Sequence, residues 1–245
     1  MILLALDMST KTGWALFKDG VQPESFGLIT KRIEWSTYEY PKNFVLVAED
    51  VANQIIGIVN QNPDITDIVI EETNKTGRFG SRHSQKILEF IHLAINQILL
   101  VGSPHIKVHY LNTSDWRKKL KLSVADTRKL AKPFLKESVR LKKELALCED
   151  RAQKKILKEK LKAFNEELKL RCIHGKIDKK SISVAYVNAT FNMNLKKGDN
   201  DISDAICLGK AFLLGAKPLS NKDIFENGEK NEEAESVVKS SEGSN

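Results

Sequence analysis

The chain has 245 residues, of which 41% are hydrophobic and 29% charged, a balance typical of a globular protein and not of a disordered chain. The net charge of +7 favours a polyanionic partner. The charge is unevenly distributed: residues 117–180 hold 22 Lys and Arg against 9 Asp and Glu, whereas residues 217–245 hold 4 against 7. A localised basic segment is stronger evidence for nucleic acid binding than a diffuse excess.

Cysteine content and hydropathy exclude several other classes of protein. Cys148, Cys172 and Cys207 form no CxxC pair, and no histidine stands at zinc-ligand spacing, so neither a disulfide framework nor a structural zinc site is expected. The first apolar run lacks a preceding basic segment and is too short for a signal peptide. No stretch approaches the roughly 18 apolar residues of a membrane span. We expect a cytoplasmic protein with no membrane partner and no small-molecule cofactor.

The chain is organised around residues 2–7, where five apolar residues run into Asp7. Such a continuous apolar run predicts a strand buried on both faces. Residues 13–17 predict a second strand, followed by an Asp-Gly hairpin turn, and residues 21–29 predict an edge strand interrupted by proline and glycine. Residues 38–60 then carry apolar side chains at helical spacing.

The next part of the chain repeats the pattern of a buried strand that ends on acid. Residues 65–70 predict a strand that runs into Glu71 and Glu72. After a loop, residues 84–100 predict a helix, and residues 105–111 alternate as a strand.

A short helix follows, capped by Thr113 or Ser114 and carrying Trp116. Beyond it, residues 134–174 contain neither glycine nor proline, and apolar residues recur with a 3–4 spacing. This segment predicts either one long amphipathic helix or a helical hairpin. Such a long element cannot lie inside a compact domain, so we expect it to project from the domain or to pair with another helix. Two further helices are expected over 181–192 and 201–212, and the polar tail 217–245 reads as disordered.

Acidic residues stand at the ends of three of these elements. Asp7 and Glu71 end the two buried strands, and Asp201 and Asp204 share one face of the first turn of the last helix. Each has an ordinary explanation: a turn residue, a polar strand end, and the helix dipole. Together, however, gathered carboxylates repel one another unless cations neutralise them. Oxygen ligands without histidine or cysteine favour Mg²⁺ or Mn²⁺. Two such ions about 3.5–4 Å apart would activate water and stabilise the leaving oxygen in phosphodiester hydrolysis.

The order of elements, a three-stranded meander followed by helix, strand, helix, strand and helices, is similar to the ribonuclease H-like fold. Three motifs resemble the RuvC group of Holliday junction resolvases, particularly its bacteriophage-encoded members: Leu6-Asp7-x-Ser9-Thr10-x-Thr12-Gly13-Trp14, Val69-Ile70-Glu71-Glu72 and Asp201-x-x-Asp204-Ala205-x-x-Leu208-Gly209. The segment Ser114-Asp115-Trp116-Arg117 is also similar to the phage branch. Two features depart from the bacterial pattern: Met8-Ser9 replaces a Pro-Gly pair, and the long basic helix has no counterpart.

The resemblance implies an α/β fold: a ribonuclease H-like mixed five-stranded sheet flanked by helices, in a domain of residues 1–216 with a basic helical insertion at about 126–176. It implies a metal-dependent, structure-selective endodeoxyribonuclease, a homodimer that nicks four-way (Holliday) and related branched DNA junctions symmetrically. It would act in the cytoplasm, that of the host cell if phage-encoded. By motif position, Mg²⁺, with Mn²⁺ also supporting activity, would be bound by the catalytic residues Asp7, Glu71, Asp201 and Asp204.

Candidate DNA contacts are basic residues near these motifs and one aromatic residue suited to stacking on an unpaired base. They are Lys11, Lys75, Arg78, Phe79, Arg82, Arg117, Lys118, Lys119 and Lys121. The basic residues have the alternative of solvated surface charge, and Phe79 that of a loop side chain covering the core. Trp116 is more typical of a core anchor than of a stacking residue. The basic helix leaves two roles open, pairing with a second subunit through its leucine stripe or extending the DNA-binding face.

Three other functions remain alternatives. A nuclease of the same fold could prefer flaps, forks or single strands, and charge and motifs do not separate it from a resolvase. The stretch from Asp7 to Gly13 also resembles the actin-like ATPases and sugar kinases, but the second domain and second phosphate loop of those enzymes are not found. A non-catalytic DNA-binding protein is disfavoured by the presence of all four acids.

Overall fold

The protein is described here from a computed structural model, which defines residues 1–72, 82–170 and 179–220. Three of the candidate DNA contacts, Lys75, Arg78 and Phe79, lie outside these ranges, as do residues 221–245 of the expected tail. Within the described part, no helix is long and apolar enough to cross a membrane.

A mixed five-stranded sheet forms the centre of the molecule, with the strand order β3-β2-β1-β4-β5. Strands β1 (Leu3–Asp7), β2 (Lys11–Phe17) and β3 (Ser25–Thr30) form the expected antiparallel meander. Strands β4 (Asp67–Glu71) and β5 (Lys107–Leu111) run parallel to β1. The central strand β1 is buried on both faces, as its continuous apolar sequence predicts.

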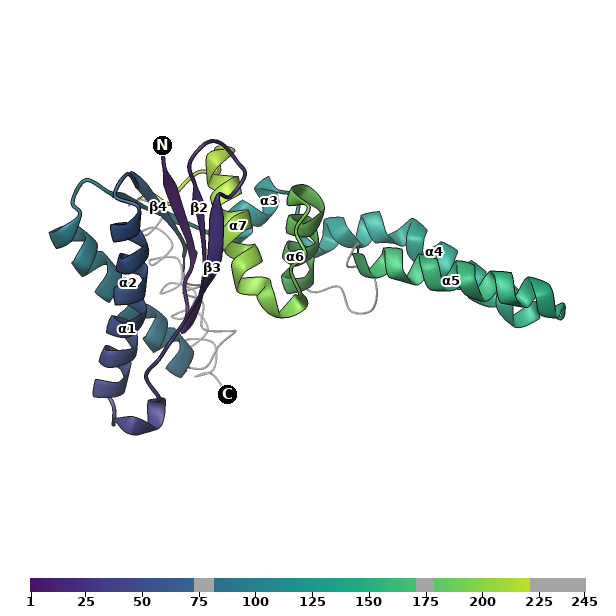
Figure 1. Cartoon of the computed structure of the whole chain (residues 1–245), viewed down its shortest axis with the longest axis horizontal. Coiled ribbons are helices and arrows are strands. Elements are labelled where there is room, and N and C mark those ends of the chain that lie inside the picture. Colours follow the sequence, from purple (N-terminus) through teal and green to yellow (C-terminus); the bar gives the residue numbers. More distant parts are fainter. Residues whose placement is uncertain (73–81, 171–178, 221–245) are drawn as a thin grey trace, which may run out of the picture.

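Helices cover both faces of the sheet (Figure 1). Helices α1 (Lys42–Gln61), which follows the short 3₁₀ turn Trp35–Thr37, and α2 (Arg82–Gly102) pack on one face. Helix α7 (Asn200–Leu213), with α3 (Thr113–Lys119) and α6 (Lys179–Phe191), packs on the other, and a 3₁₀ turn at Lys197–Asp199 leads into α7. The α/β class and the flanking helices predicted from the sequence are confirmed.

Alternate residues of β1 supply the two cores. Leu4 and Leu6 face α1 and α2, while Leu3 and Ala5 face α7. All four side chains are fully buried. Such alternation follows from the pleat of a strand, in which successive side chains point to opposite faces of the sheet. The acid-bearing end of β1 is therefore fixed by packing on both sides.

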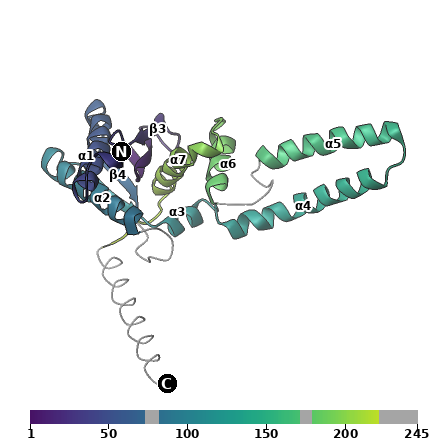
Figure 2. The same ribbon diagram turned by 90° about the horizontal axis from the view of Figure 1, so that it is seen from below.

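The basic segment forms a helical hairpin that projects from the domain (Figures 1 and 2). Helices α4 (Val124–Leu147) and α5 (Arg151–Leu170) pack against each other, and we call them together the arm. The break between them is stabilised by Asp150, whose Oδ1 accepts hydrogen bonds from the backbone N–H groups of Ala152 (2.7 Å) and Gln153 (3.1 Å). Of the two predicted forms, the structure adopts the hairpin. It begins earlier than expected because α4 continues back through Pro133.

Candidate active site

Two of the candidate acids lie side by side at one edge of the sheet. Asp7 is the last residue of β1 and Glu71 the last of β4, and the parallel register pairs Leu6 with Ile70 just before them. Because the carboxyl ends of parallel strands meet at the same edge, the two side chains are neighbours without any special loop.

Gly13 brings α7 to the same edge. This residue pairs with Asp7 across the antiparallel β1–β2 ladder. A Cβ atom at Gly13 would stand 1.9 Å from the carbonyl oxygen of Asp201, so no larger residue fits there. The close approach places the first turn of α7, and with it Asp201, directly against the end of the sheet that carries Asp7.

Polar contacts orient the first turn of α7. The side-chain amide of Asn200 donates a hydrogen bond to Asp201 Oδ1. Lys11 Nζ lies 4.0 Å from Asp201 Oδ2 and 3.5 Å from the carbonyl oxygen of Gly198. Lys11 is thus an exposed cation at the rim of the acidic edge, which is compatible with the expected phosphate contact.

Arg117 binds one of the acids inside the protein. Its Nη2 donates to Asp204 Oδ1 at 3.0 Å and its Nη1 donates to Ser183 Oγ of α6 at 3.1 Å. The residue is only 7% exposed, and its guanidinium lies 4.2 Å from the centre of the Trp116 ring. Arg117 therefore differs from the surface phosphate contact expected from the sequence, because Asp204 and Ser183 hold it away from solvent.

Two further residues of α3 hold Glu71. The indole Nε1 of Trp116 donates to Glu71 Oε2 at 2.8 Å, and the hydroxyl of Thr113 donates to Oε1 at 2.6 Å. Trp116 is fully buried, so its interpretation as a core anchor is confirmed. The N-cap of α3 is Asn112, not Thr113 or Ser114, which leaves Thr113 free to contact the acid.

This role of α3 was not predicted from the sequence. Trp116 and Arg117 are adjacent in the chain and contact two different candidate acids, Glu71 and Asp204. The available signal was a buried-type Trp-Arg pair directly after a strand. Such a pair places an aromatic donor and a cation together at a strand end, where the acids are.

Burial and mutual repulsion perturb two of the carboxyl groups. Burial raises the pKa of Asp7 well above its ordinary value, and the negative charges of Glu71, Asp204 and Asp201 raise it further, while Arg117 opposes the shift. The pKa of Asp204 is raised to about 6 by burial, against the lowering effects of Arg117 and of the Ser183 hydrogen bond. The four acids therefore lie close enough to sense one another's charge.

The donor chemistry of this edge fits a hard divalent cation, because every candidate ligand is a carboxylate oxygen. As the side chains stand, no three histidine, cysteine or acidic groups among the described residues are grouped closely enough to enclose an ion. Glu71 and Asp204 are instead engaged by Trp116 and Arg117. A bound cation would replace repulsion between the acids with attraction, and it would compete with these two donors for the same oxygen atoms.

The remaining candidate contacts divide by position. Lys118 and Lys119 are exposed on α3, and Lys121 is exposed in the turn after it. Arg82 begins α2, and its side chain is outside the described part of the structure.

The sheet order, the parallel β1–β4–β5 strands and the helices on both faces define the ribonuclease H-like fold. The structure of RuvC from Thermus thermophilus in complex with a Holliday junction substrate superposes with a TM-score of 0.50 at 6% identity, covering 89% of this chain and 100% of that one. A second T. thermophilus RuvC structure gives 0.47 at 8% identity, with 89% and 100% coverage. The yeast mitochondrial Holliday junction resolvase Ydc2 gives 0.42 at 8% identity, with 86% and 77% coverage. No protein-family model and no curated protein sequence matches the chain.

Proposed function

We propose that this protein is a metal-dependent, structure-selective DNA endonuclease that nicks four-way and related branched junctions. The observation that carries the proposal is the convergence of Asp7, Glu71, Asp201 and Asp204 from three elements of a ribonuclease H-like fold. The similarity to a resolvase fold and the basic charge of the chain support DNA as the substrate.

In this proposal the four carboxylates hold Mg²⁺, and Mn²⁺ also supports activity. The bound metal would activate water and stabilise the leaving oxygen of the phosphodiester. The chain itself orients the acids: Trp116 and Thr113 fix the plane of Glu71, and Arg117 ties Asp204 to α6. Arg117 also keeps more of Asp204 ionised near neutral pH, because a neighbouring cation lowers the pKa of that carboxyl.

The DNA would be held by cations around this edge. Lys11 at the rim, and Lys118, Lys119 and Lys121 beside α3, are the described residues proposed to contact phosphate. Lys75, Arg78 and Arg82 are proposed as further phosphate contacts and Phe79 as a stacking residue, on the sequence alone. Symmetric nicks require two active sites, so we propose a homodimer. The Ser-Asp-Trp-Arg motif favours the bacteriophage branch, acting in the cytoplasm.

A gel assay with synthetic DNA tests the proposal. Purified protein is incubated with a four-way junction, a flap, a fork and linear duplex, each with Mg²⁺, Mn²⁺ or EDTA. Paired nicks placed symmetrically across the junction, and absent with EDTA, are the expected result. Preferential cutting of flaps or forks would support a nuclease with a different DNA substrate. Tight junction binding without cleavage in either metal would overturn the proposal.

A further inference from the structure

The arm has dimensions that match duplex DNA. Helix α4 contains 24 residues and α5 contains 20. At about 1.5 Å per residue, α4 is about 36 Å long, close to the roughly 34–36 Å of one turn of B-DNA. The arm extends away from the sheet that carries the candidate acids (Figures 1 and 2). It could therefore lie beside a duplex branch well beyond the position of cleavage.

Each helix of the arm carries basic residues at spacings that keep them on one face. On α4 the spacing is i, i+3, i+7, i+11 and i+14, and on α5 it is i, i+4, i+7 and i+11. We call these the two basic stripes, and their members are all exposed: Lys129, Lys132, Lys136, Arg140 and Lys143 on α4, and Arg151, Lys155, Lys158 and Lys162 on α5. The α4 stripe is about 21 Å long at 1.5 Å per residue.

Within the described part of the chain, most of this charge has no acidic partner. Arg140 pairs with Glu137 at 2.7 Å and with Glu144 at 3.6 Å. For the lysines of the two stripes, no ion pair with an acid is found among the described residues. Like charges at i, i+3 and i, i+4 destabilise a helix, so the stripes do not serve the folding of the arm. Binding of a polyanion along the stripes would offset this repulsion.

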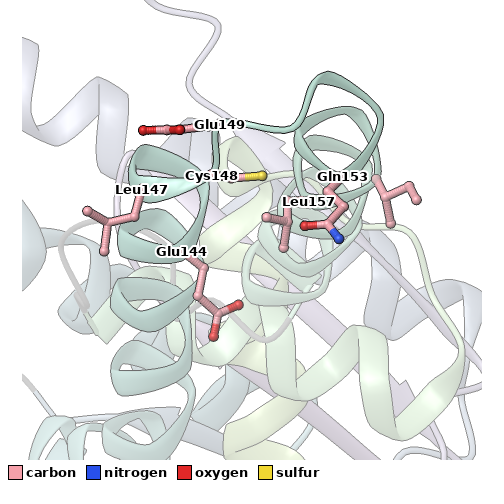
Figure 3. Close-up of a pocket in the computed structure, with 7 residues that line it drawn as sticks. Glu144, Leu147, Cys148, Glu149, Gln153 and Leu157 are labelled. Carbon is pink, nitrogen blue, oxygen red and sulfur yellow. The ribbon is translucent and has the colours of Figure 1, made fainter.

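The tip of the arm has a different character from its shaft. A hollow of about 760 Å³ lies there, lined by residues of both helices that include Glu144, Glu149 and Ile156. Figure 3 shows Glu149 pointing outward from the turn and Cys148 pointing between the helices. Glu144 and Glu149 offset part of the basic charge near the turn, so the stripe residues farther along the shaft are better placed to contact phosphate.

A second copy of the chain is the competing occupant. Leu135 and Val139 are 43% and 53% exposed, which an intersubunit contact would cover. However, Lys132 and Lys136 of the α4 stripe line the same surface hollow as these two apolar residues. Symmetric pairing of two arms along this face would bring like charges together, whereas duplex DNA, with one negative charge per about 1.7 Å of axis, complements them.

We propose that the basic stripes of α4 and α5 bind the phosphates of a duplex branch of the DNA substrate, independently of its sequence. This inference rests on the proposed function, because it takes branched DNA as the substrate. It adds that affinity depends on branch length: a branch must extend about one helical turn, or roughly 10 base pairs, past the junction before the arm contributes.

The test measures junction binding by fluorescence anisotropy in EDTA, where no metal-dependent cleavage takes place. Log affinity is plotted against log salt concentration for wild type, for K132Q/K136Q on α4, for K155Q/K158Q on α5, and for the four substitutions together. Each phosphate contact contributes about 0.9 to the slope. Each double variant should therefore lower the slope by about 2, and the quadruple variant by about 3–4, on junctions with branches of about 25 base pairs.

A matched control removes two lysines elsewhere. Lys18 follows β2 and Lys107 begins β5, both at the sheet edge opposite the acids. K18Q/K107Q removes the same charge as each double variant, so it corrects for the change in net charge, and its slope should equal that of wild type. Shortening the branches to about 8 base pairs, less than one turn, should reduce the affinity of wild type more than that of the quadruple variant.

Three outcomes would overturn the inference. Equal slopes for wild type and the quadruple variant, with helical content unchanged by circular dichroism, would show that the stripes do not contact DNA. An L135Q/V139Q variant that is monomeric in sedimentation while wild type is dimeric would assign the arm to subunit pairing. If wild type binds neither junction nor duplex, the proposed function fails as well. Metal-dependent cleavage by wild type together with equal slopes would overturn the proposed role of the arm and leave the proposed nuclease function intact.

Discussion

The acidic edge of the sheet and the arm are built on opposite principles. At the edge, each side chain is positioned by elements that are far apart in the chain. For example, Arg117 of α3 donates one hydrogen bond to Asp204 of α7 and another to Ser183 of α6. In the arm, two helices pack on each other and their charged side chains point into solvent. Chemistry on one phosphodiester requires fixed geometry, whereas sequence-independent phosphate binding requires only charge at a suitable spacing.

The largest difference should appear when one charge is removed from the acidic edge. Asp7→Asn or Glu71→Gln should abolish cleavage while junction binding persists or strengthens, because each substitution removes a proposed metal ligand and reduces repulsion of phosphate. Cleavage and binding are measured on the same four-way junction. Asp64→Asn, on an exposed loop, is the matched control and should cut like wild type. Parallel loss of binding and cleavage in Asp7→Asn would point to a folding role instead.

The same contrast applies to arginine ion pairs. Arg117→Ala should lower the free energy of unfolding by about 3–5 kcal/mol, because it leaves the carboxylate of Asp204 buried without its partner. Arg140→Ala breaks an exposed pair in the arm and should change stability little, since solvent screens such pairs. Urea denaturation of both variants measures the difference. Similar losses in the two variants would contradict the distinction between the regions.

Two glycines, one in close contact with a neighbouring element and one with open space around it, should respond oppositely to substitution by alanine. Gly13→Ala should destabilise the protein by at least about 1–3 kcal/mol, because its Cβ would overlap the Asp201 carbonyl and force α7 off the sheet. Gly57→Ala on α1 meets nothing within 4 Å and should stabilise the protein by about 0.5–1 kcal/mol through helix propensity. Thermal unfolding gives both values. A neutral Gly13→Ala would show that α7 is not seated closely on the strand.

The smallest of these effects is a pH dependence of stability in metal-free protein. The pKa of Asp204 is raised to about 6 from an ordinary value of 3.8, so the folded state binds more protons than the unfolded state between these values. Its contribution therefore stabilises the fold at low pH and is lost as pH rises through about 6. His92 acts in the opposite direction, because burial lowers its pKa to about 4.

The difference in free energy of unfolding between Asp204→Asn and wild type isolates the contribution of Asp204. In EDTA, the free energy of unfolding of Asp204→Asn relative to wild type should rise by about 1–1.5 kcal/mol between pH 5 and pH 7.5. Urea denaturation at the two pH values measures it. A difference that does not vary with pH would mean that Asp204 ionises normally in the folded protein.

Much of the fold could be predicted because the signals were local. The apolar run of β1 and the acid after it predicted a central strand ending at a site, and the parallel pairing of β1 with β4 brings Glu71 beside Asp7. The hairpin in the arm could not be separated from one long helix, because the apolar spacing is the same in both. The contacts of Trp116 and Arg117 were not predictable, since they depend on where α3 docks against acids from distant parts of the chain.

The most direct test of the central claim, that these four acids hold a divalent metal, is calorimetric titration of metal-free protein with Mn²⁺. Wild type should bind the ion saturably, and Asp7→Asn and Asp204→Asn should each bind it at least about 10-fold more weakly, as loss of a ligand or of its supporting contacts requires. Asp64→Asn should match wild type. Equal Mn²⁺ affinity in wild type, Asp7→Asn and Asp204→Asn would contradict the account, because the metal would then be held elsewhere.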